Sequence, residues 1–246
     1  RDRPIEAGLA LAAWATIVAG LVTGITTIRS YTDSVDAYFY GLYGKSAVIV
    51  VAGDPLRAGG REALAAATVD MLRASPLVEE IAATRVVDVA YQGTRVPVFS
   101  FPAQAIASRG DLRYATRTPD QLRAALSNGE IAMNDTFANR FGVRVGDSIE
   151  LPTSHGARVF RIGSVIRGGV GPTGALHMDE ASFDRVFSAI EGENILVALW
   201  LAPPVAGSIR ALQTIDTPQA LFFLRGADLA HALLLDRPQE LHLHRE

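Results

Sequence analysis

The chain has 246 residues, of which 49% are hydrophobic, so it can bury a sizeable core in one large or two small domains. Its 23 basic and 26 acidic residues give a formal charge of −3 without a long block of either sign, which argues against nucleic-acid binding. Cysteine is absent, which excludes a disulfide framework, a thiolate metal site and a cysteine nucleophile.

The N-terminal segment predicts a membrane-spanning helix within residues 1–30. Ala7 to Ile28 are 22 consecutive residues without a charged side chain, enough to cross the ~30 Å hydrocarbon core as a helix. Small residues recur at every fourth position from Gly8 to Gly24, a spacing that lets helices approach closely in a bilayer. An aromatic cluster typical of the lipid headgroup region follows: Tyr31, Tyr38, Phe39, Tyr40 and Tyr43.

Three other kinds of segment share some of these features. A secretory signal peptide has a shorter apolar run and a small-residue cleavage site, and an amphipathic surface helix needs a charged face. A core helix of a soluble domain stays open, because Ala and Thr are only mildly apolar. Arg1 and Arg3 precede the run, Arg29 follows it directly, and the acidic Asp33 and Asp36 lie beyond, which favours a cytoplasmic N-terminus. Because the chain opens at Arg1, we expect it to be a segment of a longer polypeptide.

The next part of the chain predicts the order β-α-β-β. A β-branched run from Ala47 to Ala52 predicts a buried strand. A helix is expected to follow, ending at Pro76, with its apolar face formed by Leu64, Ala67, Thr68, Met71 and Leu72. Extended runs at Arg85–Tyr91 and Arg95–Phe101, separated by Gln92-Gly93-Thr94, predict a β-hairpin.

A second group of elements begins at a capping box. Thr118-Pro119-Asp120-Gln121 predicts the start of a short helix that ends at Asn128-Gly129. A strand over Glu130–Met133 is expected next, followed by a helical turn with Asp135 as N-cap and Gly142 as its stop. Strands over Ser148–Leu151 and Arg158–Arg167 are expected to flank the turn Thr153–Gly156.

The C-terminal part predicts a strand over Ile195–Leu201 and a helix over Val205–Leu212, started by Pro203-Pro204. The tail from Ala220 has a helical pattern that includes Leu233–Leu235. Leu241–Glu246 shows no pattern that predicts an element.

The stretch from Glu130 to Phe187 resembles the extracytoplasmic domain of FtsX-like, MacB-type permeases. That family shows the pattern G-[LV]-x-x-G-D-x-I-x-L, a hairpin, F-x-[IV]-x-[GS]-V-I-R and a loop that ends at an acidic residue. The matching positions are Gly142, Val143, Gly146, Asp147, Ile149, Leu151, Phe160, Ile162, Val165, Ile166, Arg167 and Asp179. The P-x-V-E-E-I stretch at Pro76–Ile81 also looks like the family. Asp147 itself is expected to be a turn residue without a chemical role.

The resemblance implies an α+β fold, in which one transmembrane helix precedes a two-lobed extracytoplasmic domain. A β-α-β, porter-like lobe would comprise residues 31–92 and 193–246, and a mixed α/β lobe, residues 93–192, would be inserted into it. It also implies a bacterial inner-membrane location, a cytoplasmic ABC ATPase, a second permease subunit or half, and contact with membrane lipids. Such permeases export substrates such as lipoproteins or signal to a partner. No later spanning helix is present in this chain, which departs from the family.

No catalytic, cofactor-binding or metal site is assigned from the sequence. Gly169–Gly174 spells the dinucleotide fingerprint G-x-G-x-x-G after a strand, but Pro172 interrupts the position where a helix should open. Ser154, His155 and Asp179 supply the residue types of a catalytic triad without a nucleophile elbow. Two candidate metal-ligand pairs, His177 with Asp179 and His242 with His244, lack a third ligand, so surface histidines are expected.

Two functions follow from these patterns. The preferred one is a non-enzymatic segment of an ABC transporter permease, whose outer domain couples ATP-driven motion to a substrate or partner. The alternative is a soluble α/β enzyme, either nucleotide-dependent or hydrolytic, in which residues 7–28 form a core helix. The Walker A pattern is absent, so we expect any ATP hydrolysis to belong to a partner subunit.

Overall fold

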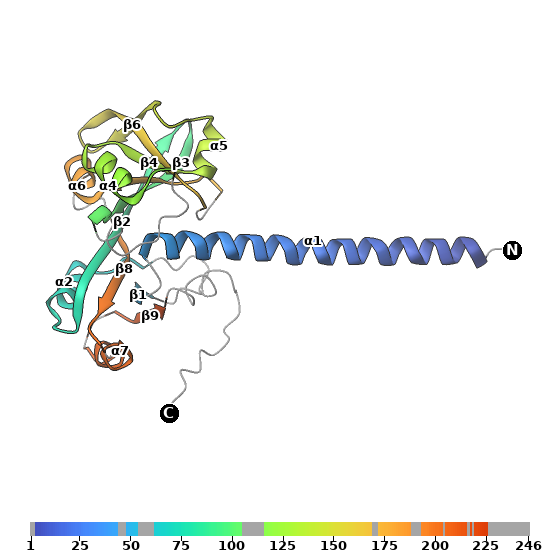
Figure 1. Cartoon of the computed structure of the whole chain (residues 1–246), viewed down its shortest axis with the longest axis horizontal. Helices are drawn as coiled ribbons and strands as arrows, with labels where there is room; N and C mark the ends of the chain where they lie inside the picture. Colours follow the sequence, from blue (N-terminus) through green and yellow to red (C-terminus); the bar gives the residue numbers. More distant parts are fainter. Residues whose placement is uncertain are drawn as a thin grey trace. The chain divides into compact units, whose positions relative to one another are not determined.

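A computed structural model describes residues 3–43, 48–53, 62–104, 116–168, 172–187, 193–203, 205–215, 217 and 219–225. It divides into two compact units, Arg1–Ser34 and Val35–Glu246, which are described separately. Figure 1 shows the elements. The helices are α1 (Arg3–Tyr43), α2 (Ala66–Ala74), α4 (Pro119–Ser127), α5 (Asp135–Phe141), α6 (Glu180–Val186) and α7 (Val205–Gln213). The strands are β1 (Val48–Ala52), β2 (Val78–Tyr91), β3 (Thr94–Phe101), β4 (Ile131–Asn134), β5 (Ser148–Thr153), β6 (Gly156–Ile166), β7 (Leu176–Asp179), β8 (Glu193–Leu201) and β9 (Leu221–Arg225).

Helix α1 is longer than expected. It continues without a break from the apolar window to Tyr43, so the predicted aromatic cluster belongs to the same helix. The side chains of those aromatic residues lie outside the described part of the structure.

The strands follow one another in the order β5-β6-β4-β7-β3-β2-β8-β1-β9. The pairs β4–β6 and β3–β7 are parallel, and the other neighbouring pairs are antiparallel. The unit Val35–Glu246 therefore contains a mixed sheet together with helices, which is the α+β fold expected from the sequence.

One strand takes part in both halves of this sheet. The first part of β2, from Val78 to Val86, pairs with β8, and its last part, from Val86 to Tyr91, pairs with β3. The register with β8 shifts between Thr84 and Arg85, which marks an irregularity where the strand passes from one half to the other. The sequence predicted only Arg85–Tyr91 as a strand, because the acidic residues of the Pro76–Ile81 stretch obscure its alternation.

Two hydrophobic cores lie on this sheet. The first joins β1, β8, α2 and α7 and contains Val48, Val50, Ala52, Leu64, Val69, Leu72, Ala83, Val197, Leu199, Leu201 and Leu212. The second includes residues of β3 to β7, α5 and α6, among them Val96, Ile131, Phe137, Leu151, Ile162, Leu176 and Phe183. Strand β2 contributes Ala83 to the first core and Val89 to the second. The lobe boundaries expected from the sequence remain a proposal, which these two cores support.

Several local predictions hold. Thr118 Oγ1 accepts a hydrogen bond from Gln121 N, and Gln121 Oε1 accepts one from Thr118 N, so the capping box of α4 is confirmed. Gly142 ends α5 in the left-handed conformation at φ 67°. Gln92 and Gly93, at φ 47° and 75°, form the two-residue turn between β2 and β3.

Other predictions were wrong. The tail from Ala220 was expected to be helical, but Leu221–Arg225 forms β9, which satisfies the free backbone edge of β1. Leu233–Leu235 and Leu241–Glu246 lie outside the described residues. Strand β7 and helix α6 were not predicted at all. The apolar face of α2 was predicted to include Ala67, but Ala67 is exposed and Val69 is buried in its place. The helix begins only at Ala66, and its buried face is rotated relative to the predicted one.

Candidate functional site

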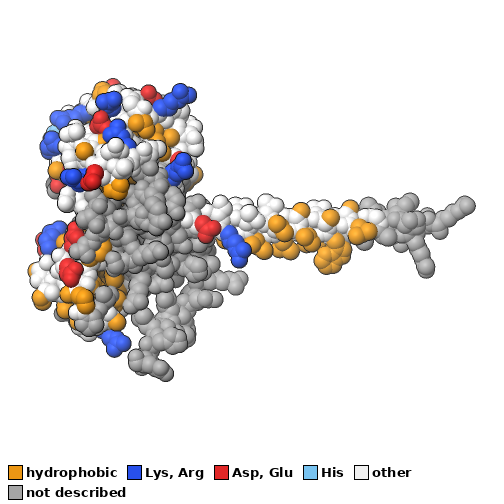
Figure 2. All heavy atoms as spheres, viewed as in Figure 1, with side chains coloured by type: hydrophobic (Ala, Val, Ile, Leu, Met, Phe, Trp, Pro, Cys, Tyr) orange, Lys and Arg blue, Asp and Glu red, His pale blue; other side chains and the backbone are white. Residues whose placement is uncertain are grey.

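The apolar window of α1 presents large side chains to the outside. Leu11–Ser30 has a mean hydropathy of 1.8, and none of it is buried. The exposed large apolar residues are Leu11, Trp14, Ile17, Val18, Leu21, Val22, Ile25 and Ile28. Hydrophobic side chains gather along one side of this helix (Figure 2). A surface of this kind in water would forfeit the free energy of apolar burial, so it requires an apolar partner such as lipid. A core helix of a soluble domain is mostly buried, whereas no residue of this window is buried among the described residues.

The remaining face of α1 carries small residues. The positions of Gly8, Gly20 and Gly24 have no neighbouring atom within 4 Å of where a Cβ would lie. Thr16 Oγ1 donates a hydrogen bond of 2.9 Å to the carbonyl oxygen of Ala12, so its hydroxyl is satisfied within the helix. Such internal pairing is required of polar groups in lipid, where water is absent.

The glycine-rich segment does not continue as a nucleotide-binding motif. Gly169–Gly171 lie outside the described residues, and the segment after Gly174 enters strand β7 instead of a helix. A dinucleotide site needs the N-terminus of a helix at this point to hold the pyrophosphate. Packing explains why a glycine stands at position 174. The residue is buried at φ 73°, and a Cβ there would lie 2.3 Å from the backbone nitrogen of Phe137.

Asn134 joins this loop to helix α5. Its buried Oδ1 accepts hydrogen bonds from Phe137 N at 3.0 Å and from Ala175 N at 2.9 Å. Its own backbone nitrogen donates to the carbonyl oxygen of Ala175. Asn134 is therefore the N-cap of α5, where Asp135 had been expected. The sequence could not distinguish them, because both residue types are good N-caps and the second partner of Asn134 is distant in the chain.

Replacing Asn134 with alanine is expected to destabilise the folded domain by about 3 kcal/mol, because two buried N–H groups lose their acceptor. The matched change is Thr118→Ala at the exposed cap of α4, where about 1 kcal/mol is expected since water replaces the lost hydroxyl. Urea unfolding of the full chain in detergent measures both. Equal losses would contradict the double role of Asn134.

The triad residue types are not arranged for catalysis. Ser154 and His155 are exposed at the tip of the β5–β6 hairpin, where Ser154 N donates to Val186 O and His155 N donates to Thr153 Oγ1. Asp179 lies at the N-cap position of α6. No hydrogen bond or ion pair between Asp179 and either hairpin residue is present in the described part of the chain. Ser154 and His155 belong to the hairpin turn, and Asp179 precedes the first residue of α6.

His177 is buried, so the expectation that it lies on the surface was wrong. Its exposed fraction is 1%, and its ring lies 5.5 Å from the ring centroids of both Phe99 and Phe101. Burial lowers its pKa to about 3, which keeps the imidazole neutral at physiological pH. Within the described residues, no three His, Cys, Asp or Glu side chains come together as a metal site. His242 and His244 lie outside those residues.

Asp147 has the turn role expected of it. Its Oδ2 accepts a 2.8 Å hydrogen bond from Arg144 N, and Gly146 beside it adopts φ 98°. Gly146 and Asp147 of the family motif therefore form the turn that precedes β5.

A charged group at the irregularity of β2 was missed by sequence reasoning. Arg85, with a side chain only 15% exposed, pairs with Asp184 of α6, and its guanidinium lies 5.1 Å from the ring centroid of Phe183. Nearby, burial raises the pKa of Glu180, and the positive charge of Arg85 opposes that rise. These contacts tie α6 to the strand shared by both cores. They could not be anticipated because α6 itself was not predicted.

No family profile matches the chain, and no curated protein matches it. Among solved structures, it is similar to the periplasmic region of MacB from Actinobacillus actinomycetemcomitans, at 10% identity and a TM-score of 0.46, over 79% of this chain and 95% of that one. It is also similar to the extracellular domain of the ABC-type transporter YknZ from Gram-positive bacteria, at 13% identity and a TM-score of 0.41, over 72% and 98%.

Proposed function

We propose that this chain is a non-catalytic segment of an ABC transporter permease, in which α1 spans the bacterial inner membrane and the following α+β segment lies outside the cytoplasm. The observation that carries the proposal is the uncovered apolar window Leu11–Ser30 at the start of the chain. Its 20 residues cover ~30 Å as a helix, which is the thickness of the hydrocarbon core.

The proposed role is mechanical. A cytoplasmic ABC ATPase would supply the energy, and a second permease subunit or half would complete the membrane part. Motion transmitted through α1 would reach the outer domain and act on a substrate, such as an exported lipoprotein, or on a partner protein. Strand β2 supports this role, because it contributes Ala83 to one core and Val89 to the other and would therefore transmit a displacement between them.

Labelling of introduced cysteines tests the orientation, since the chain contains no cysteine of its own. Ser148→Cys places a thiol at an exposed position of β5, and Asp2→Cys places one before α1. In intact spheroplasts, a membrane-impermeant maleimide is expected to label the Ser148→Cys chain at once. The Asp2→Cys chain is expected to react only after the membrane is permeabilised.

Extraction of the same membranes at alkaline pH provides the second measurement. We expect the chain to stay in the membrane pellet and to need detergent for release. Recovery of the full chain as a detergent-free monomer, with both thiols protected in intact spheroplasts, would overturn the proposal and favour the soluble enzyme.

A further inference from the structure

Between the two hydrophobic cores the sheet narrows to a single strand. Among the described residues, the ladder of hydrogen bonds passes from one half of the sheet to the other only through β2, which lies between β3 and β8. Val86 is the one described residue of β2 with partners on both sides, Phe99 of β3 and Glu193 of β8. Motions between packed units are absorbed by a few residues at such a crossing, so this point is where the two cores can turn relative to each other.

The backbone of Arg85 is held at this crossing by the second half of the sheet. Arg85 lies one residue before Val86, where the register of β2 with β8 shifts. Its backbone N–H donates a 2.8 Å hydrogen bond to Oγ of Ser100, a residue of β3 that is 1% exposed. A buried hydroxyl thus satisfies a backbone group at the irregularity of the strand.

The side chain of Arg85 connects the two halves. In the sheet Arg85 pairs with Asn194 of β8, so its backbone belongs to the half that contains the first core. Its guanidinium pairs with Asp184 and lies 5.1 Å from the ring centroid of Phe183, both in α6, and Phe183 is fully buried in the second core. An exposed ion pair contributes little to stability, but the Arg85 side chain is only 15% exposed and makes a charge-assisted and a cation–π contact together.

Helix α2 of the first core adds a weaker attraction to α6. Burial raises the pKa of Glu180 in the first turn of α6, and the charges of Arg85 and, more weakly, Arg73 oppose that rise, whereas Asp184 and Asp179 add to it. Arg73 lies in the last turn of α2, and its side chain is 54% exposed. Water screens the charge of Arg73, so the main restraint between the halves comes from Arg85.

We propose that Arg85 is a latch that holds the two cores in one relative orientation, and that breaking its contact with α6 makes the crossing of β2 a hinge. With the contact in place, the domain moves as one body. With the contact broken, the second core turns relative to the first about the crossing. The inference concerns the folded unit alone, so it holds or fails independently of whether α1 spans a membrane.

Distances between spin labels on the full chain in detergent test the latch. The chain has no cysteine of its own, so two introduced thiols carry the only labels. Ser148→Cys on β5 and Ala211→Cys on α7 are exposed positions in the two halves. Pulsed electron paramagnetic resonance is expected to give one narrow distance distribution in the otherwise wild-type chain. Arg85→Gln is expected to raise the fraction of molecules outside that distribution about tenfold, because both side-chain contacts with α6 are lost.

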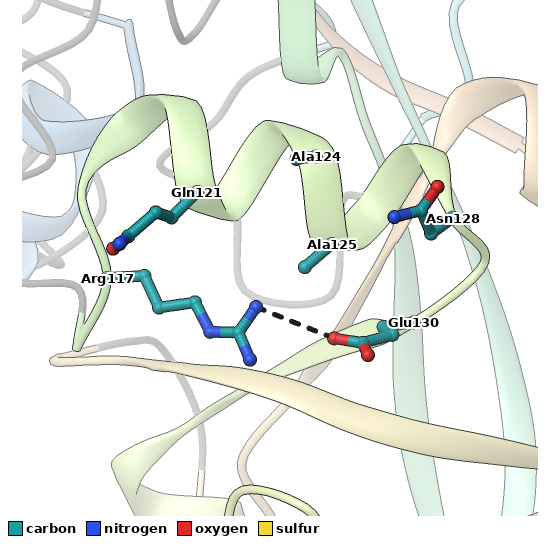
Figure 3. A pocket seen from close by; sticks show the side chains of 6 residues that line it. All are labelled: Arg117, Gln121, Ala124, Ala125, Asn128 and Glu130. Carbon is teal, nitrogen blue, oxygen red and sulfur yellow. Dashed lines mark ion pairs between the residues drawn. The ribbon is translucent and has the colours of Figure 1, made fainter.

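Two further variants make the result specific. Asp184→Ala removes the same ion pair from its half-exposed side, where the fold tolerates the change, and should reproduce much of the effect of Arg85→Gln. Arg117→Gln is the matched control. Arg117 and Glu130 face each other beside α4 (Figure 3), with 3.6 Å between Nη1 and Oε2, and neither residue belongs to the crossing of β2. This variant is expected to leave the distances between the halves unchanged.

Unchanged distances between the halves in both Arg85→Gln and Asp184→Ala would overturn the inference. An equal change in Arg117→Gln would do the same, because the loss of any ion pair would then loosen the domain. A label pair within the second half, Ser148→Cys with Ser127→Cys, distinguishes hinge motion from unfolding. Its distances are expected to stay the same in Arg85→Gln, and broadening there would also contradict the latch.

Discussion

Gly174→Ala is expected to lower the free energy of unfolding of the folded domain by about 3–5 kcal/mol, the largest single effect among the changes considered. A Cβ at this position would lie 2.3 Å from Phe137 N and 2.6 Å from Asn134 Oδ1. Phe137 N belongs to the backbone of α5, so it cannot move aside as a flexible side chain would. The φ of 73° adds strain for any residue with a side chain.

Gly93→Ala is the matched control, because Gly93 has nearly the same φ, 75°, but no atom within 4 Å of its would-be Cβ. Its expected cost is about 1–2 kcal/mol from backbone strain alone. Trp200, which is buried in β8, reports unfolding by fluorescence once Trp14, the other tryptophan, is replaced by phenylalanine. Equal costs for the two glycines would show that the loop does not pack on α5 as described.

Acidification is expected to destabilise the domain through His177. Its pKa is about 3 in the folded state, against an ordinary value of 6.5, so the unfolded chain binds more protons between these pH values. The contribution of neutral His177 to the free energy of unfolding is therefore complete above pH 6.5 and is lost as the pH falls toward 3. Between pH 7 and pH 4.5 the expected loss is roughly 2–3 kcal/mol, at ~1.4 kcal/mol per pH unit below 6.5.

His177→Phe isolates this contribution, because phenylalanine keeps an aromatic ring beside Phe99 and Phe101 and carries no proton. Urea unfolding at several pH values is expected to show a shallower dependence in His177→Phe than in wild type, whatever its stability at pH 7. His155→Gln, a change at the exposed hairpin tip, should leave the dependence unaltered. Parallel curves for wild type and His177→Phe would refute the buried, neutral imidazole.

The candidate site was only partly predictable. The absence of a helix after the glycine-rich segment was anticipated from Pro172, and the turn role of Asp147 from Gly142 and Gly146, which permit positive φ. The ion pairs of Glu130 with Arg117 and Arg161 were not anticipated, although the capping box of α4 was recognised. Glu130 precedes β4 and Arg161 lies in β6, and a single stretch of sequence does not bring them together.

What the sequence alone determined are the features that depend on neighbouring residues: the uncharged span of α1, the capping box of α4, the glycine stop of α5 and the β-hairpin at Gln92-Gly93-Thr94. What only the tertiary structure decided are features that depend on distant partners. The four residues of β7 are too few to show a period, and they form a strand because β3 and β4 pair with them. The same pairing places His177 between aromatic rings, and the free edge of β1 makes a strand of β9. Hydrogen bonds and burial across the sheet outweigh local propensity in these segments, since each is too short to hold its own conformation.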